Sequence, residues 1–82
     1  MRNKKRIREL LDILEEIWKT NPDLRLGQLI KNQYQEKDFY YEEDDKFLMR
    51  LAYSISDDEK RNKITAKLFK IHIFEKRKKN EQ

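Results

Sequence analysis

The sequence predicts an all-α fold, a small bundle of about four helices in which the last helix is long. Apolar residues recur at helical spacing along most of the chain, and a single Gly and a single Pro are too few for a turn-rich β fold. The 82 residues have room for one domain, residues 1–82. Because 44% of the residues are charged and 37% hydrophobic, a core can close only if the apolar residues form narrow stripes.

The first helix is expected from about Lys4 to Thr20. At helical spacing its apolar side chains fall within an arc of roughly 120°, which is typical of an amphipathic helix. The segment Asn21-Pro22-Asp23 ends it, because Pro disfavours helical geometry at the residue before it. The stripe that should face the core consists of Ile7, Leu10, Leu11, Leu14, Ile17 and Trp18.

Two shorter helices should follow. One spans residues 24–35, and the other begins near Glu43, where acidic residues suit the positive end of a helix dipole. The stretch 36–41 breaks the period and is expected to be a loop, in which Phe39 and Tyr40 join Trp18 as core anchors. The residues expected to be buried by the third helix are Phe47, Leu48, Leu51, Ala52 and Ile55.

The last helix is expected over residues 57–78, after a capping box formed by Ser56 and Glu59. It carries two apolar stripes on nearly opposite sides, and only one of them can face the domain core. The second stripe is therefore sandwiched inside the domain, or meets a second subunit or partner, or belongs to a strand over residues 67–74 in an α+β fold. We favour a helix with an interface face. The stripes are Ile64, Leu68, Ile71 and Phe74 on one side and Ala66, Phe69 and Ile73 on the other.

Basic residues gather at both ends of the chain, whose net charge is +4. In an up-down-up-down bundle these two ends lie together, so their cations could neutralise phosphates and give salt-dependent nucleic-acid binding. The alternative is a pair of solvated, frayed ends, residues 1–5 and 76–82. The candidate contacts are Arg2, Lys4, Lys5, Arg6, Arg8, Lys76, Arg77, Lys78 and Lys79.

The middle of the chain is acidic, with carboxylates concentrated in residues 36–45. This run could dock on a basic partner surface, or it could cap the third helix and pair with Arg25 inside the domain. Adjacent carboxylates such as Asp44 and Asp45 point about 100° apart on a helix, so we expect no metal site.

A polar stripe on the second helix is the most site-like group of residues. Arg25, Gln28 and Asn32 lie at i, i+3 and i+7, and an Arg with two amides can bind a carboxylate, a phosphate or a nucleobase edge. They could equally fasten the following loop, an interpretation that Gly27 favours because Gly allows another backbone to approach closely.

The residues that carry most catalysis are sparse. His72 is the only histidine, and because the sequence offers it no obvious partner we expect a surface or interface histidine and not a catalytic one. The chain has no cysteine, no metal-spaced histidine pair and no Gly-rich phosphate loop. We therefore expect no enzymatic activity, no cofactor and no metal. The basic start runs into an amphipathic stripe and no apolar run is long enough to span a membrane, so we expect a cytoplasmic protein of a bacterial host cell.

The pattern W-x4-DLRLGQLI-x-N, followed by FY-x-EDD, resembles a family of small uncharacterised proteins of bacteria and of their phages and prophages. The resemblance covers residues 6–51, and residues 25–32 are its most specific part. An extra Tyr at position 41 departs from the pattern, and the segment after Tyr53 lies outside it. The resemblance implies a phage or prophage origin and no particular activity.

These observations lead to one hypothesis and two alternatives. The leading hypothesis is a non-enzymatic phage-type accessory protein that binds a host or viral macromolecule, with a homodimer formed through Ala66, Phe69 and Ile73. Inhibition of a bacterial defence system is one form of it, and only the resemblance implies that form. The first alternative is a nucleic-acid-binding module that uses the basic ends. The second is a protein that sequesters a small anionic ligand or nucleotide.

Overall fold

The computed structural model describes the backbone of residues 4–80 and the side chains of residues 4–73. Within this part the chain forms four helices and no strand, which confirms the all-α prediction. The segment 67–74 is helical, so the alternative of a strand there is wrong. The helices are α1 (Lys5–Lys19), α2 (Leu26–Tyr34), α3 (Asp44–Ala52) and α4 (Asp58–Asn80).

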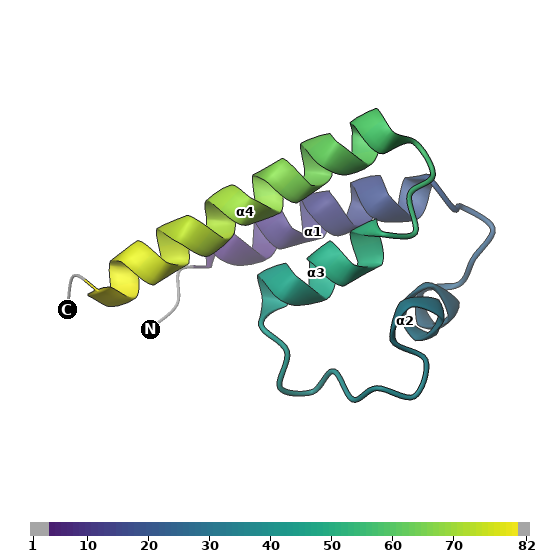
Figure 1. Cartoon of the computed structure of the whole chain (residues 1–82), viewed down its shortest axis with the longest axis horizontal. Coiled ribbons are helices and arrows are strands. Elements are labelled where there is room, and N and C mark those ends of the chain that lie inside the picture. The colour runs from purple at the N-terminus through teal and green to yellow at the C-terminus, as the bar shows by residue number, and fades with distance from the viewer. Residues whose placement is uncertain (1–3, 81–82) are drawn as a thin grey trace.

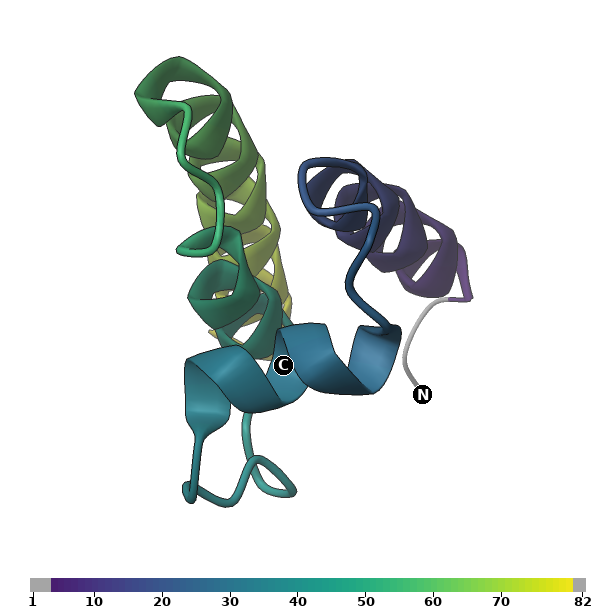
Figure 2. The same ribbon diagram turned by 90° about the vertical axis from the view of Figure 1, so that its right-hand side faces the viewer.

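Three of the helices lie side by side and the fourth crosses them. α1 and α4 run antiparallel, and α3 runs beside them in the same direction as α1 (Figure 1). α2 lies across this group, so the bundle is not the simple up-down-up-down arrangement that we expected (Figure 2). The start of α1 and the end of α4 nevertheless lie at the same end of the molecule, because these two helices are antiparallel (Figure 1).

All four helices contribute to one core. Its fully enclosed side chains include Ile17 from α1, Leu29 from α2, Leu51 from α3 and Leu68 from α4, each with 0% of its surface exposed. Burial of such a side chain stabilises the fold by about 1.5–3 kcal/mol. The whole set of buried residues is Ile13, Ile17, Leu29, Tyr34, Leu48, Leu51, Ala52, Ile55, Ile64 and Leu68.

The side of α1 that faces the core differs from the predicted stripe. Ile13 is buried although it lies outside that stripe, whereas Ile7 and Leu11 are 52% and 48% exposed. The apolar arc of α1 is wider than the surface of α1 that contacts α3 and α4. Because Ile13 and Ile17 pack into the core, one edge of the arc faces away from it. The uncovered edge remains on the surface.

Three polar contacts fasten the long helices to one another. Arg6 pairs with Asp44 and joins α1 to α3, while Lys67 lies 3.1 Å from Glu16 and joins α4 to α1. The third contact joins His72 on α4 to the first turn of α3. Asp44 thus pairs with Arg6, and His72, for which the sequence shows no obvious partner, pairs with Asp45.

The start of α4 is capped by a residue other than the predicted one. The Asp57 carboxylate accepts hydrogen bonds from the backbone N–H groups of Glu59 and Lys60, at 3.0 and 3.2 Å. Its oxygen therefore satisfies helix N–H groups that have no partner in the first turn. The prediction of a capping box that begins at Ser56 is wrong by one residue.

Among the aromatic residues within the connection between α2 and α3, Phe39 is the one that packs on rings of the helices. The Phe39 ring packs 5.4 Å from the ring of Tyr34 and 5.6 Å from that of Phe47, although 45% of Phe39 stays exposed. Tyr40 is 79% exposed, so its expected role as a core anchor is wrong. Trp18 is half-buried against the core, as expected.

Candidate interaction surfaces

The side of α4 that points away from the core carries an exposed apolar stripe, which we call the α4 outer face: Ala66, Phe69 and Ile73. Phe69 is 56% exposed and Ile73 is 39% exposed. The opposite side of the helix is the buried one, where Ile64 and Leu68 are 1% and 0% exposed. The helix is two-sided, as its sequence predicted. Phe74, which we assigned to the buried side, lies outside the described side chains.

Contacts on both flanks fix the rotation of α4 about its axis. Near its start, Arg61 Nη1 donates a hydrogen bond of 3.1 Å to the carbonyl oxygen of Ile55. Further along, Lys67 reaches Glu16 on α1, and His72 Nδ1 lies 2.6 Å from Asp45 Oδ2 on α3. Because neighbours hold the helix on both flanks, the outer face cannot turn inward without breaking these contacts.

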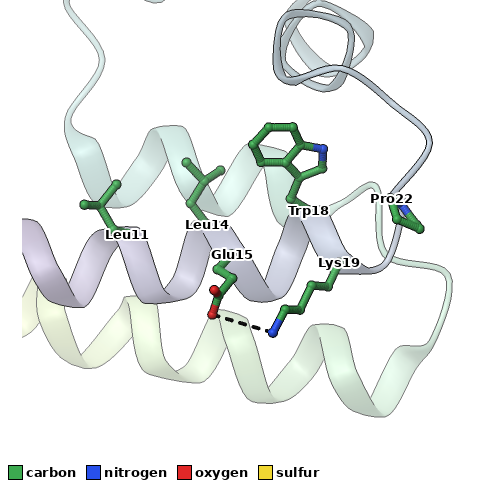
Figure 3. A pocket seen from close by; sticks show the side chains of 6 residues that line it. All are labelled: Leu11, Leu14, Glu15, Trp18, Lys19 and Pro22. Atoms are coloured by element: carbon green, nitrogen blue, oxygen red, sulfur yellow. Dashed lines mark ion pairs between the residues drawn. The ribbon is translucent and has the colours of Figure 1, made fainter.

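A second apolar surface lies along α1, which we call the α1 groove. It is an open cavity of about 450 Å³ beside the connection to α2. Leu11, Leu14 and Trp18 point to the same side of α1, towards α2 (Figure 3). Glu15 and Lys19 point the other way and pair at 3.7 Å (Figure 3). The groove is lined by Leu11, Leu14, Glu15, Trp18, Lys19 and Pro22.

The turn after α1 holds the groove in shape. Trp18 Nε1 donates a hydrogen bond of 2.7 Å to the carbonyl oxygen of Leu24, which ties the indole to the start of α2. The backbone N–H of Asn21 donates to the carbonyl of Trp18 at 2.9 Å, and that of Leu24 to the carbonyl of Asn21 at 3.2 Å. The sequence did not predict this groove, since Leu11, Leu14 and Trp18 were all assigned to the core.

Two of the predicted basic residues are engaged in ion pairs within the domain. Arg6 pairs with Asp44 and Arg8 with Asp12, so two of the cations on α1 are already engaged by carboxylates. The Asp12 carboxylate raises the pKa of Arg8, chiefly by accepting its hydrogen bond. Lys4 and Lys5 are exposed. Arg2, Lys76, Arg77, Lys78 and Lys79 lie outside the described side chains, and fraying of the ends stays a prediction.

The predicted polar stripe at the start of α2 and along it is exposed. Arg25, Gln28 and Asn32 all lie on the surface, and Gln28 Oε1 accepts a hydrogen bond of 2.9 Å from the backbone N–H of Arg25. This bond satisfies an N–H group at the start of α2, a capping role. A Cβ added at Gly27 would meet nothing within 4 Å, so the expected close approach of another backbone there is wrong.

One titratable group is embedded where α2, α3 and their connection meet. Tyr34 is 3% exposed, its hydroxyl donates to Glu42 at 3.2 Å, and the Arg50 guanidinium lies 5.0 Å from its ring centre. Burial raises the pKa of Tyr34, and the Glu42 carboxylate raises it further, while Arg50 opposes this. The phenol therefore stays protonated as a hydrogen-bond donor that anchors the connection.

The described residues form neither a metal-binding cluster nor a helix that could cross a membrane. No group of three or more His, Cys, Asp or Glu side chains in this part of the chain could hold a metal ion. Among residues 4–80, none of the helices combines the length and apolar character that crossing a bilayer requires.

Comparison of the chain with protein-family models, with curated proteins and with solved structures gave no match.

Proposed function

We propose that this protein is a non-enzymatic accessory protein that acts by binding a macromolecule of a host cell or of a virus. The observation that carries the proposal is the α4 outer face, where Phe69 and Ile73 remain 56% and 39% exposed on a helix whose opposite side is buried at Ile64 and Leu68. Apolar residues aligned on one helix face are more informative than scattered exposed ones. In this proposal the face forms a homodimer.

The α1 groove supports the proposal independently, as the surface for the macromolecular partner. Its volume of about 450 Å³ is in the range of sites that accept apolar side chains. Trp18 lines it and is held by its bond to Leu24, so little conformational freedom is lost when a partner binds. Aromatic side chains in such positions often dominate binding energy. The partner that fits is an amphipathic segment with apolar anchors.

The biological setting of the proposal rests on the resemblance of residues 25–32 to phage and prophage proteins. A small accessory protein of this kind would act in the cytoplasm of a bacterial host. Inhibition of a bacterial defence complex is one form that such binding would take.

Trp18 gives a direct test, because it is the only tryptophan of the chain and it lines the α1 groove. Tagged wild-type protein is used to capture a partner from the bacterium that carries the gene, and the purified partner is then titrated into the untagged protein. We expect stoichiometric binding that shifts the Trp18 emission. We expect Leu11→Asp to weaken it about tenfold or more, because a charge enters the apolar groove.

Tyr41→Asp is the matched control, because Tyr41 is 90% exposed and lies outside the groove. It should bind like the wild-type protein. Failure to recover a partner that saturates at a defined stoichiometry, or equal loss of binding in both variants, would contradict the proposal.

One observation favours a second candidate, a nucleic-acid-binding module. The start of α1 and the end of α4 lie at the same end of the molecule, which brings the two basic segments of the sequence together (Figure 1). The anisotropy of a labelled DNA duplex or single strand, or of an RNA, should then rise on binding, with an affinity that falls steeply with salt. Replacing Lys4, Lys76 and Lys78 by Glu should reduce both affinity and salt slope, whereas Lys31→Glu should not. Absence of binding at low salt would exclude this candidate.

A further inference from the structure

We infer that the α1 groove binds an amphipathic α-helix of a partner protein, laid along α1 from Trp18 past Leu11 to Ile7. The inference rests on the proposed function. It adds the conformation of the bound segment, its path on the surface and its recognition by apolar anchors without net charge. Three properties of the groove and its surroundings lead to it.

The first property is the shortage of free hydrogen-bonding groups among the described residues that line the groove. The Trp18 indole N–H already donates to the Leu24 carbonyl at 2.7 Å, and Pro22 has no backbone N–H. Leu11 and Leu14 contribute only carbon atoms through their side chains. An extended segment would therefore bring backbone N–H and C=O groups against a surface that cannot bond them. A helix satisfies these groups internally, so a helix is the conformation that this groove accepts.

The lack of a sheet edge leads to the same conclusion. Residues 4–80 contain no strand, so an extended peptide would find no edge there with which to pair. Of the common ways in which a protein binds a peptide, a helix in an apolar groove is the one that this surface fits.

The second property is the spacing of the apolar residues on this side of α1. Ile7, Leu11, Leu14 and Trp18 follow one another at intervals of four, three and four residues, the repeat with which packed helices interdigitate. Ile7 lies outside the lining of the cavity, yet it is half-exposed like Leu11 and continues the row. The row is about 16 Å long, which matches about three turns of a second helix.

The third property is the balance of charge along the open flank of this row. Arg8 Nε donates a hydrogen bond of 2.9 Å to Asp12, and Lys19 lies 3.7 Å from Glu15. Glu15 and Lys19 also point away from the groove side chains (Figure 3). Because the four charges sum to zero, this flank offers no net attraction to an acidic or a basic partner. The partner is therefore recognised through apolar anchors on one face of its helix, and nucleic acid gains nothing here.

A synthetic peptide of about 15 residues serves as the probe, with leucines on one helical face and equal numbers of glutamate and lysine elsewhere. In one control peptide the same residues are reordered so that the leucines surround the helix. In a second control peptide a central residue is replaced by Pro, which breaks the helix. We expect the helical peptide to saturate the Trp18 emission change, and both controls to bind about tenfold more weakly or less.

Two substitutions test the path of the bound helix. Leu11→Asp places a charge in the cavity, and Ile7→Asp places one further along the row and outside the cavity. We expect Leu11→Asp to weaken peptide binding about tenfold or more, and Ile7→Asp about threefold or more. Both residues are about half-exposed, so circular dichroism should show an intact fold. Tyr41→Asp adds the same charge outside the groove and is the matched control, which should bind like the wild-type protein.

Salt dependence tests recognition without net charge. Asp23 and Arg25, both exposed at the connection to α2, are also opposite in sign, and Lys4 precedes the row beyond Ile7. For the neutral peptide we expect the dissociation constant to change by less than about threefold between low and high salt. A steep fall of affinity with salt would indicate recognition by charge and would overturn this part of the inference.

The outcomes separate the inference from the proposed function. A peptide that does not bind at millimolar concentration, or a Pro-containing peptide that binds equally well, would overturn the helical occupant. An unchanged affinity of Ile7→Asp beside a weakened Leu11→Asp would overturn the path along α1. In either case the proposed function stands if the captured partner binds the wild-type protein and loses affinity with Leu11→Asp. If that partner binds Leu11→Asp and Tyr41→Asp equally, the proposed function fails whatever the peptide does.

Discussion

The Nδ1 atom of His72 on α4 lies 2.6 Å from Oδ2 of Asp45 in the first turn of α3. Both side chains are mostly covered, with 27% and 13% of their surfaces exposed. This contact matters for function because His72 immediately precedes Ile73 of the α4 outer face. By fastening one flank of the helix to α3, it determines which side chains of α4 face outward.

His72→Ala is expected to destabilise the protein by about 1–3 kcal/mol, because it leaves the largely covered Asp45 carboxylate without this partner. The free energy of unfolding in urea measures the effect. Lys70→Ala, an exposed position on the same helix, should change it by less than about 0.5 kcal/mol. Asp45→Asn should lower the free energy of unfolding less in the His72→Ala background than in the wild-type protein. Equal losses of unfolding free energy in the two backgrounds would contradict a direct interaction.

Tyr34→Phe should change how stability depends on alkaline pH. The pKa of Tyr34 is raised in the folded state above the ordinary value of about 10, so the folded state holds this proton more tightly than the unfolded state. The corresponding stabilisation is complete below about pH 10 and is lost as the pH rises through the higher folded-state pKa. The melting temperature of the wild-type protein should therefore fall more steeply above about pH 10 than that of Tyr34→Phe. Parallel curves would contradict this.

Asp57→Ala should cost about 1 kcal/mol of unfolding free energy, since the Asp57 carboxylate caps the N–H groups of Glu59 and Lys60. Ser56→Ala should have an effect below about 0.5 kcal/mol, because Ser56 is exposed and precedes the cap. Thermal unfolding followed by circular dichroism distinguishes the two variants. A larger loss for Ser56→Ala would restore the capping box that the sequence predicts.

Gly27→Ala should stabilise the protein by about 0.5 kcal/mol, which is about 2–4 °C in melting temperature for a domain of this size. The added methyl group meets nothing within 4 Å, and Ala loses less backbone entropy than Gly when a helix forms. Differential scanning calorimetry measures the shift. A destabilising effect would indicate that Gly27 has a close neighbour after all.

The helices and the two-sided character of α4 could be predicted from the sequence because local periodicity encodes both. Ile64 and Leu68 on one side and Phe69 and Ile73 on the other are separated by nearly half a turn, and a helix cannot bring both sides to one core. The all-α class followed from the same periodicity.

Features that depend on contacts distant in sequence could not be predicted in this way. The apolar arc of α1 does not reveal that Ile13 faces the core while Leu11 lines a groove, because the neighbouring helices decide the direction of contact. The pairing of His72 with Asp45 likewise requires the packing of α4 against α3. No local pattern distinguishes Phe39, which packs on other rings, from Tyr40, which stays exposed.

The central claim is that the exposed face of α4 joins two copies of this chain. Sedimentation velocity over a wide concentration range tests it most directly, with wild-type protein beside Phe69→Asp. Phe69 is 56% exposed, so the substitution should leave folding intact, which circular dichroism verifies. We predict that the wild-type protein approaches twice the mass of one chain as concentration rises, and that Phe69→Asp stays at the mass of one chain. A wild-type protein that remains monomeric throughout, or a variant that dimerises equally well, would contradict the claim.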